Sequence, residues 1–203
     1  FFLFSSFSNA GNIGYASNSS VEIYYDVGSS ESNQEYLLGV KFKLDPGWHT
    51  YWKNPGDSGE KASFEWTLPD GFKIDGPFWP QPEKIPYPPL MTFGYNDEVI
   101  VFFKLSSSGR INDDSEISLS TKWLACADVC LPQEAFIKTK INENPISNKN
   151  ALEMNDSFNK NIPKVFKKNI SATYINNSLV LSFELPDRHC LLYTSDAADD
   201  QAC

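Results

Sequence analysis

The feature that most constrains the fold is the alternation of apolar and polar side chains along the first 143 residues. In residues 36–44, for example, Leu38, Val40, Phe42 and Leu44 fall on one side, which is the period of a half-buried β-strand. The same period predicts six more strands, at residues 21–27, 63–68, 72–74, 99–105, 117–124 and 135–141. Short strands separated by Gly, Pro, Asn and Asp turns indicate an antiparallel β-sandwich.

A proline-rich segment interrupts this pattern. Residues 77–89 contain six prolines in thirteen positions, a density that is incompatible with the interior of a sheet. We therefore predict an extended, stiff surface loop here, which leads to the apolar segment 90–95.

Beyond residue 143 the composition changes. Residues 144–168 are polar and rich in Asn and Lys, and we interpret them as a linker with one short helix around Ala151, Met154 and Phe158. Residues 169–188 then resemble a hairpin that turns at Asn176-Asn177. Two strands alone are marginally stable, so this hairpin is interpreted as the start of a truncated second β domain.

Both ends of the chain differ from the rest. Residues 1–16 begin with an apolar run and small residues, and we interpret them as the remnant of a secretory signal peptide. Residues 189–203 resemble a translated sequencing adaptor and are interpreted as a non-native tail, which would exclude Cys190 and Cys203 from the native cysteines. An exported chain reaches a compartment where disulfides persist.

Two cysteines, Cys126 and Cys130, lie four positions apart, just after the expected strand 117–124. A strand continued straight through them would hold their Cα atoms roughly 13 Å apart, too far for a disulfide. A bond between them therefore requires residues 127–129 to turn, and Asp128 is a residue that turns favour. So short a loop stabilises a fold by only about 2 kcal/mol in the chain-entropy model. The spacing favours a redox-active pair, with a structural disulfide and a metal-binding or inert pair as the alternatives.

A second conspicuous run, residues 47–59, carries Trp48, His49, Tyr51 and Trp52 before a Pro-Gly turn. It fits either core aromatics at the end of a strand or an exposed aromatic patch for a partner. His49 has no acidic or serine partner at a recognisable spacing, which argues against a hydrolase triad. The formal net charge of −9, with no basic cluster, argues against binding to nucleic acid or to an anionic membrane surface.

Five separated motifs occur in a particular order. They are residues 46–52, residues 54–59, Trp79-Pro80 with Pro82-Glu83, the triplet Phe93-Gly94-Tyr95, and residues 123–134 with both cysteines. In this order, over about residues 20–143, they resemble the N-terminal periplasmic domain of the DsbD and ScsB thiol:disulfide interchange proteins. The spacing of Cys126 and Cys130 is that of the ScsB-like branch, since the DsbD branch places its pair further apart.

The resemblance implies an all-β, immunoglobulin-like sandwich with Cys126 and Cys130 as its redox pair. It implies that Phe93, Gly94 and Tyr95 form an aromatic cap loop over the cysteines, although the DsbD branch orders these residues differently. It also implies a periplasmic location and no cofactor or metal. A membrane domain and a thioredoxin-like domain would follow in a full-length protein anchored in the inner membrane, so any membrane contact would come from those downstream segments.

The expected function is therefore thiol–disulfide exchange, a protein-disulfide reductase activity carried by one domain of a larger protein. The domain would pass electrons from a membrane reductase, through its thioredoxin-like domain, to oxidised periplasmic proteins. Two alternatives remain open: a non-catalytic interaction module in which the disulfide pins a turn, and a copper-handling module.

Overall fold

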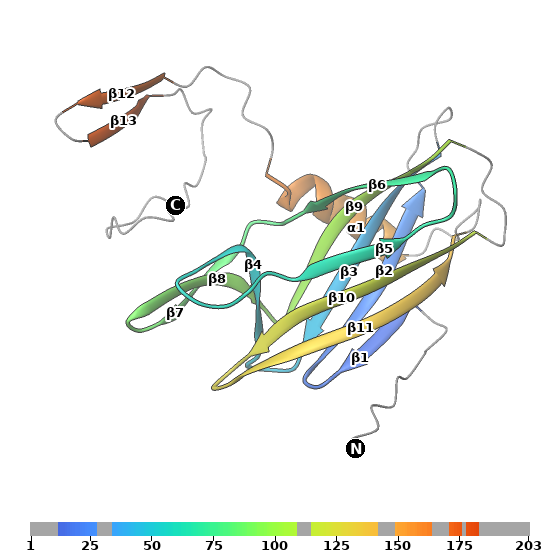
Figure 1. Cartoon of the computed structure of the whole chain (residues 1–203), viewed down its shortest axis with the longest axis horizontal. Helices are drawn as coiled ribbons and strands as arrows, with labels where there is room; N and C mark the ends of the chain where they lie inside the picture. Colours follow the sequence, from blue (N-terminus) through green and yellow to red (C-terminus); the bar gives the residue numbers. More distant parts are fainter. Residues whose placement is uncertain are drawn as a thin grey trace. The chain divides into compact units, whose positions relative to one another are not determined.

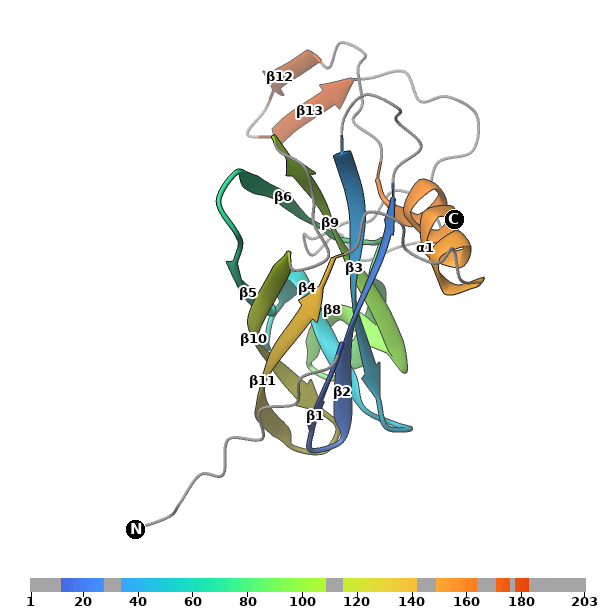
Figure 2. The same cartoon turned by 90° about the vertical axis from the view of Figure 1, so that its right-hand side faces the viewer.

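The computed structural model describes residues 12–27, 34–108, 115–141, 149–163, 171–175 and 178–182. The chain divides into two units after Pro163. In the first unit the described strands form two antiparallel sheets, which are shown in Figures 1 and 2. The first sheet has the order β1 (Ile13–Ala16), β2 (Ser19–Val27), β3 (Gln34–Leu44), β9 (Glu98–Ser107) and β6 (Phe72–Phe78). The second has the order β11 (Cys130–Lys140), β10 (Glu116–Cys126), β4 (His49–Gly56), β8 (Leu90–Asn96) and β7 (Glu83–Tyr87), and β5 (Ser63–Thr67) also pairs with β10.

The two sheets enclose one main hydrophobic core. Alternation produces it directly, because every second residue of β3, β9 and β10 points between the sheets. Phe42 from the first sheet packs edge-on against Trp123 from the second, with ring centroids 5.3 Å apart. At one edge the sheets nearly touch, since a Cβ at Gly14 of β1 would lie 2.8 Å from the Cβ of Ala135 of β11. The immunoglobulin-like all-β sandwich expected from the sequence is confirmed.

All seven predicted strands are present, but the chain also forms strands that the pattern did not predict. The proline-rich loop prediction is wrong for β7, which pairs with β8 in a regular antiparallel register. Pro86 is tolerated there because β7 is the edge strand of its sheet, so the missing N–H removes no hydrogen bond to a second neighbour.

The N-terminal boundary also differs from the expectation. Ile13–Ala16, which we assigned to the signal-peptide remnant, form β1 and pair with residues 19–22 of β2. Gly14 is buried, so this segment belongs to the sandwich. Residues 1–11 lie outside the described residues, as does the whole of the 189–203 tail.

The expected helix forms as α1 (Lys149–Asn161), and it packs on the outer face of the first sheet. Met154 is almost fully buried there against Leu37 and Phe102. A Cβ at Gly39 would lie 2.7 Å from the Met154 sulfur, so the absence of a side chain at Gly39 leaves the space that Met154 occupies. This part of the expected linker is therefore a layer of the first unit.

The second unit contains one described hairpin, β12 (Ser171–Ile175) and β13 (Ser178–Ser182). The two strands pair in an antiparallel register up to Ile175 and Ser178, and the predicted turn at residues 176–177 lies outside the described residues. Every residue of both strands is exposed.

Candidate functional site: a disulfide at a hairpin tip

Cys126 and Cys130 close the tip of the β10–β11 hairpin. They are the last register pair of these strands, and their sulfurs form a disulfide with the Cα atoms 4.1 Å apart. Residues 127–129 make the turn, in which the Ala127 amide donates to the Val129 carbonyl at 3.0 Å. The sequence analysis required this turn, and the structure confirms it.

The two cysteines differ sharply in exposure. Cys126 is 1% exposed, because its strand continues between two neighbours and it pairs with both Cys130 and His49 of β4. Cys130 is exposed, and it begins β11, the edge strand of the sheet. The neighbouring Val129 is 59% exposed. A reactant arriving from solvent therefore meets Cys130, while Cys126 lies behind it.

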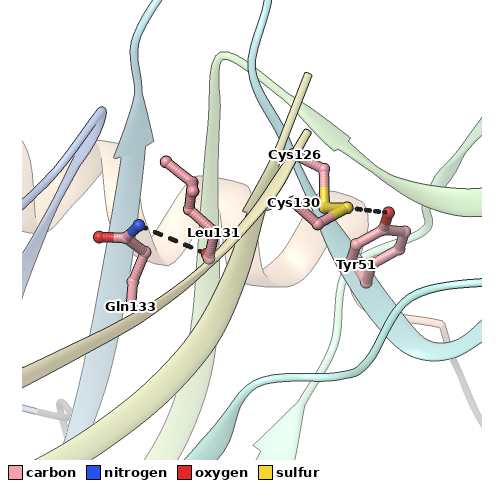
Figure 3. Close-up of a disulfide and its surroundings, with 5 residues drawn as sticks. All are labelled: Tyr51, Cys126, Cys130, Leu131 and Gln133. Carbon is pink, nitrogen blue, oxygen red and sulfur yellow. Dashed lines mark hydrogen bonds between the residues drawn. A yellow bond between two sulfur atoms is a disulfide. The ribbon is translucent and has the colours of Figure 1, made fainter. Parts of the chain in front are cut away.

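Tyr51 of β4 is the side chain that contacts the disulfide. Its hydroxyl oxygen lies 3.6 Å from the Cys130 sulfur, and Figure 3 shows this oxygen directed at that atom. Because a sulfur in a disulfide carries no proton, the phenol is the donor. On the other side of the tip, the Gln133 amide donates to the Leu131 carbonyl at 3.4 Å.

Tyr51 was not among the predicted site residues. Residues 47–59 were interpreted as core aromatics at the end of a strand or as an exposed aromatic patch for a partner. Trp48 and Trp52 do pack against the main core. Side chains alternate along a strand, so Tyr51 and His49 share the opposite face. The available signal was the spacing: once His49 pairs with a cysteine, a tyrosine two residues later lies on the same face.

The ring of Tyr51 is held in place by the segment that follows β4. A Cβ at Gly59 would lie 2.2 Å from a Tyr51 ring carbon, so the backbone of Gly59 lies directly against the ring. Gly59 has φ +94°, a conformation that glycine adopts readily and other residues do not. Tyr51 thus sits between this segment and the disulfide.

Burial determines the protonation of the two polar rings beside the cysteines. It raises the pKa of Tyr51 above its ordinary value of 10.0, although the hydrogen bond from Ser58 opposes that shift. The phenol is therefore protonated at neutral pH and can donate. Burial lowers the pKa of His49 below 6.5, so its imidazole is neutral at that pH. The two rings meet edge to face with centroids 5.3 Å apart.

The expected cap triplet, Phe93-Gly94-Tyr95, lies in strand β8 rather than in a loop. The reason is its pairing with β4, in which Gly94 is the register partner of Tyr51 and Tyr95 that of Thr50. Tyr95 packs in the main core, stacked on Trp79 with its hydroxyl donating to the Pro80 carbonyl at 2.8 Å. The triplet is thus one strand away from the residue that contacts Cys130.

Within the described residues, no cluster of three or more His, Cys, Asp or Glu side chains could hold a metal ion. No helix in this part of the chain has both the length and the apolar character needed to cross a bilayer.

The fold and the hairpin-tip cysteine pair define the class of protein. Residues 20–140 match the family model described as "Thiol:disulfide interchange protein DsbD, N-terminal". The chain therefore belongs to the DsbD N-terminal family and carries a thiol:disulfide interchange domain of that family.

A solved structure gives the particular comparison. The N-terminal periplasmic domain of ScsB from Proteus mirabilis superposes with a TM-score of 0.61 at 20% sequence identity. The match covers 85% of this chain and 68% of that one. At this identity the similarity establishes a shared fold. Among curated protein sequences, none matches this chain.

Proposed function

We propose that this domain relays electrons in the periplasm, taking two from a thioredoxin-like donor and giving them to an oxidised protein partner. One observation carries the proposal: the disulfide lies at a hairpin tip with Cys130 exposed and Cys126 covered. A disulfide whose only role is to hold the turn closed does not require an exposed sulfur, whereas a disulfide that reacts with a partner does. The Cys126–Cys130 bond would also stabilise the fold weakly, since it closes so short a loop.

The chemistry proceeds by two thiolate attacks. In the reduced domain, the Cys130 thiolate attacks the partner's disulfide, which forms a Cys130–partner bond and releases the other partner sulfur as a thiolate. The Cys126 thiolate then attacks the Cys130 sulfur, which re-forms the intramolecular disulfide and releases the partner's second sulfur. Two electrons pass to the partner, and its two thiolates take up protons. The donor reverses these steps when it reduces the domain.

The similarity to this family supports the proposed periplasmic location and partners. ScsB, the structural neighbour, is described as having an N-terminal periplasmic domain. The DsbD family is described by thiol:disulfide interchange, which supports a protein disulfide as the substrate. The activity then belongs to one domain of a larger protein.

The aromatic triplet is proposed as a cover for the disulfide. Phe93, Gly94 and Tyr95 lie in the strand next to β4, and β4 supplies the Tyr51 that contacts Cys130. The pairing of their strand with β4 would therefore hold Tyr51 against the sulfur and hinder small oxidants.

The reduction potential of the pair tests the proposal. Titration of a chain that ends at Arg188, and so lacks Cys190 and Cys203, is made against glutathione or thioredoxin buffers and followed by thiol labelling. It is expected to give two reactive thiols per folded chain and a potential above about −300 mV. A potential well below that value, or failure to reduce without unfolding, would leave only the structural disulfide.

A further inference from the structure

Cys130 has a hydrogen-bond donor beside it. The five sequence motifs did not indicate a role for this donor at the cysteine pair. The Tyr51 hydroxyl lies 3.6 Å from its sulfur, within the range of an O–H···S contact. This contact joins Tyr51 of β4 to the first residue of β11.

The direction of this contact follows from the protons available. The disulfide sulfur can only accept, so the Tyr51 hydroxyl donates to Cys130. Burial keeps Tyr51 protonated, and Gly59 holds its ring in position.

A disulfide sulfur is a weak acceptor, whereas a thiolate carries a full negative charge. A donor already aimed at this sulfur therefore gains most when the bond opens, because hydrogen bonds to charged groups are about twice as strong as neutral ones. A donor that favours the charged form of a thiol lowers its pKa.

We propose that the Tyr51 hydroxyl stabilises the Cys130 thiolate whenever the Cys126–Cys130 disulfide is open. This inference rests on the proposed exchange function and adds a residue to it. Tyr51 serves both directions of exchange. It raises the thiolate fraction when Cys130 attacks a partner, and it stabilises Cys130 as the leaving group when the second thiol of a donor breaks the Cys130–donor disulfide. The proton stays on Tyr51 throughout, so the electron balance of the exchange is unchanged.

The test is the pH profile of Cys130 alkylation in the reduced full chain, followed by mass spectrometry with iodoacetamide as the probe. Tyr51→Phe retains the ring that packs on Gly59 and removes only the hydroxyl. The Cys130 thiol pKa is expected to rise by about one unit, which slows alkylation about tenfold at neutral pH.

Tyr24→Phe is the matched control. It also removes one phenol hydroxyl, which bonds Glu22 on β2 in the first sheet, and it should leave the profile unchanged. An unchanged profile in Tyr51→Phe would overturn the inference. So would faster alkylation by one constant factor at every pH, because that would show Tyr51 to be only a cover.

The two proposals fail separately. A shifted alkylation profile without any adduct to a thioredoxin-like protein would reject the relay and keep the thiolate donor. Adduct formation with an unshifted profile would do the reverse.

Discussion

At the scale of single residues, the two cysteines differ in their surroundings, and we propose from this difference that they have different roles in exchange. Cys130 is exposed and contacts a donor, whereas Cys126 is buried between two strands. We expect Cys126→Ser to accumulate a mixed disulfide through Cys130 with a thioredoxin-like protein that lacks its own resolving cysteine. Cys130→Ser should accumulate little, because an incoming disulfide cannot reach the buried sulfur in line.

Non-reducing electrophoresis with mass mapping of the linked peptide measures both adducts. The opposite pattern would exchange the roles of the two cysteines and keep the relay. Absence of an adduct in both variants would contradict the relay itself.

Gly59 is expected to be more sensitive to substitution than another glycine with a similar backbone. Gly59→Ala places a methyl group within the space of the Tyr51 ring, in addition to the strain of a positive φ. Gly47 has φ +83°, but a methyl group there would meet nothing within 4 Å. Gly47→Ala therefore measures the cost of the positive φ alone. Urea unfolding should show a loss of about 1 to 2 kcal/mol for Gly47→Ala and of at least about 3 kcal/mol for Gly59→Ala. Equal losses would mean that the contact between Gly59 and the ring contributes nothing.

His49 is expected to make stability depend on pH. Because burial lowers its pKa in the folded state below 6.5, the unfolded chain binds more protons at His49 as the pH falls past 6.5. The stabilisation is therefore fully present above that pH and is lost as the pH falls toward the folded-state pKa. In His49→Gln, the difference in unfolding free energy between about pH 7 and about pH 5.5 should shrink. If the difference persists in full, other groups account for it.

At the scale of elements, the pairing of β8 with β4 connects the aromatic triplet to the disulfide. Replacing Phe93 and Tyr95 by Ala together should loosen the position of Tyr51 and speed oxidation of the reduced pair by peroxide. Stopped-flow measurement of thiol loss checks this, with circular dichroism to show that the sheet is intact. An intact fold with an unchanged rate would reject the cover. Because Tyr95 also stacks on Trp79, Phe93→Ala alone provides the milder variant.

The helix layer shows how an element expected from local sequence can acquire a different role. Residues 144–168 predicted a linker helix, and α1 falls within them. Its position on the sheet depends on Gly39, a residue more than one hundred positions earlier, whose missing side chain leaves space for Met154. No pattern near the helix contains that information.

At the scale of the whole molecule, the main core, the disulfide and α1 all lie within residues 13–163. Deletion of residues 189–203, the expected non-native tail, should therefore leave the melting temperature unchanged within error. Calorimetry of the full chain and of a chain that ends at Arg188 makes the comparison. A marked fall in melting temperature would show that the tail contributes to the fold.

The sequence by itself determined the sandwich and the position of its cysteine pair. Alternation with period two dictates which strand faces are buried, and that pattern is written in neighbouring residues. The closed turn of residues 127–129 was likewise required by the reach of a disulfide. The five motifs, taken in order, indicated the family.

Only the tertiary structure decided which side chain reaches the sulfur. Tyr51 contacts Cys130 across 79 positions because β4 pairs with β10 at His49 and Cys126, a register that no local pattern contains. The sequence did not predict strand β7 or the burial of Gly14 for the same reason. A proline fits in β7 because this strand is the edge of its sheet, and Gly14 is buried because the other sheet lies against it. Both conditions exist only in the assembled fold. Contacts between distant strands follow from the register of the assembled sheets, and the register is settled only when all the buried faces are packed together.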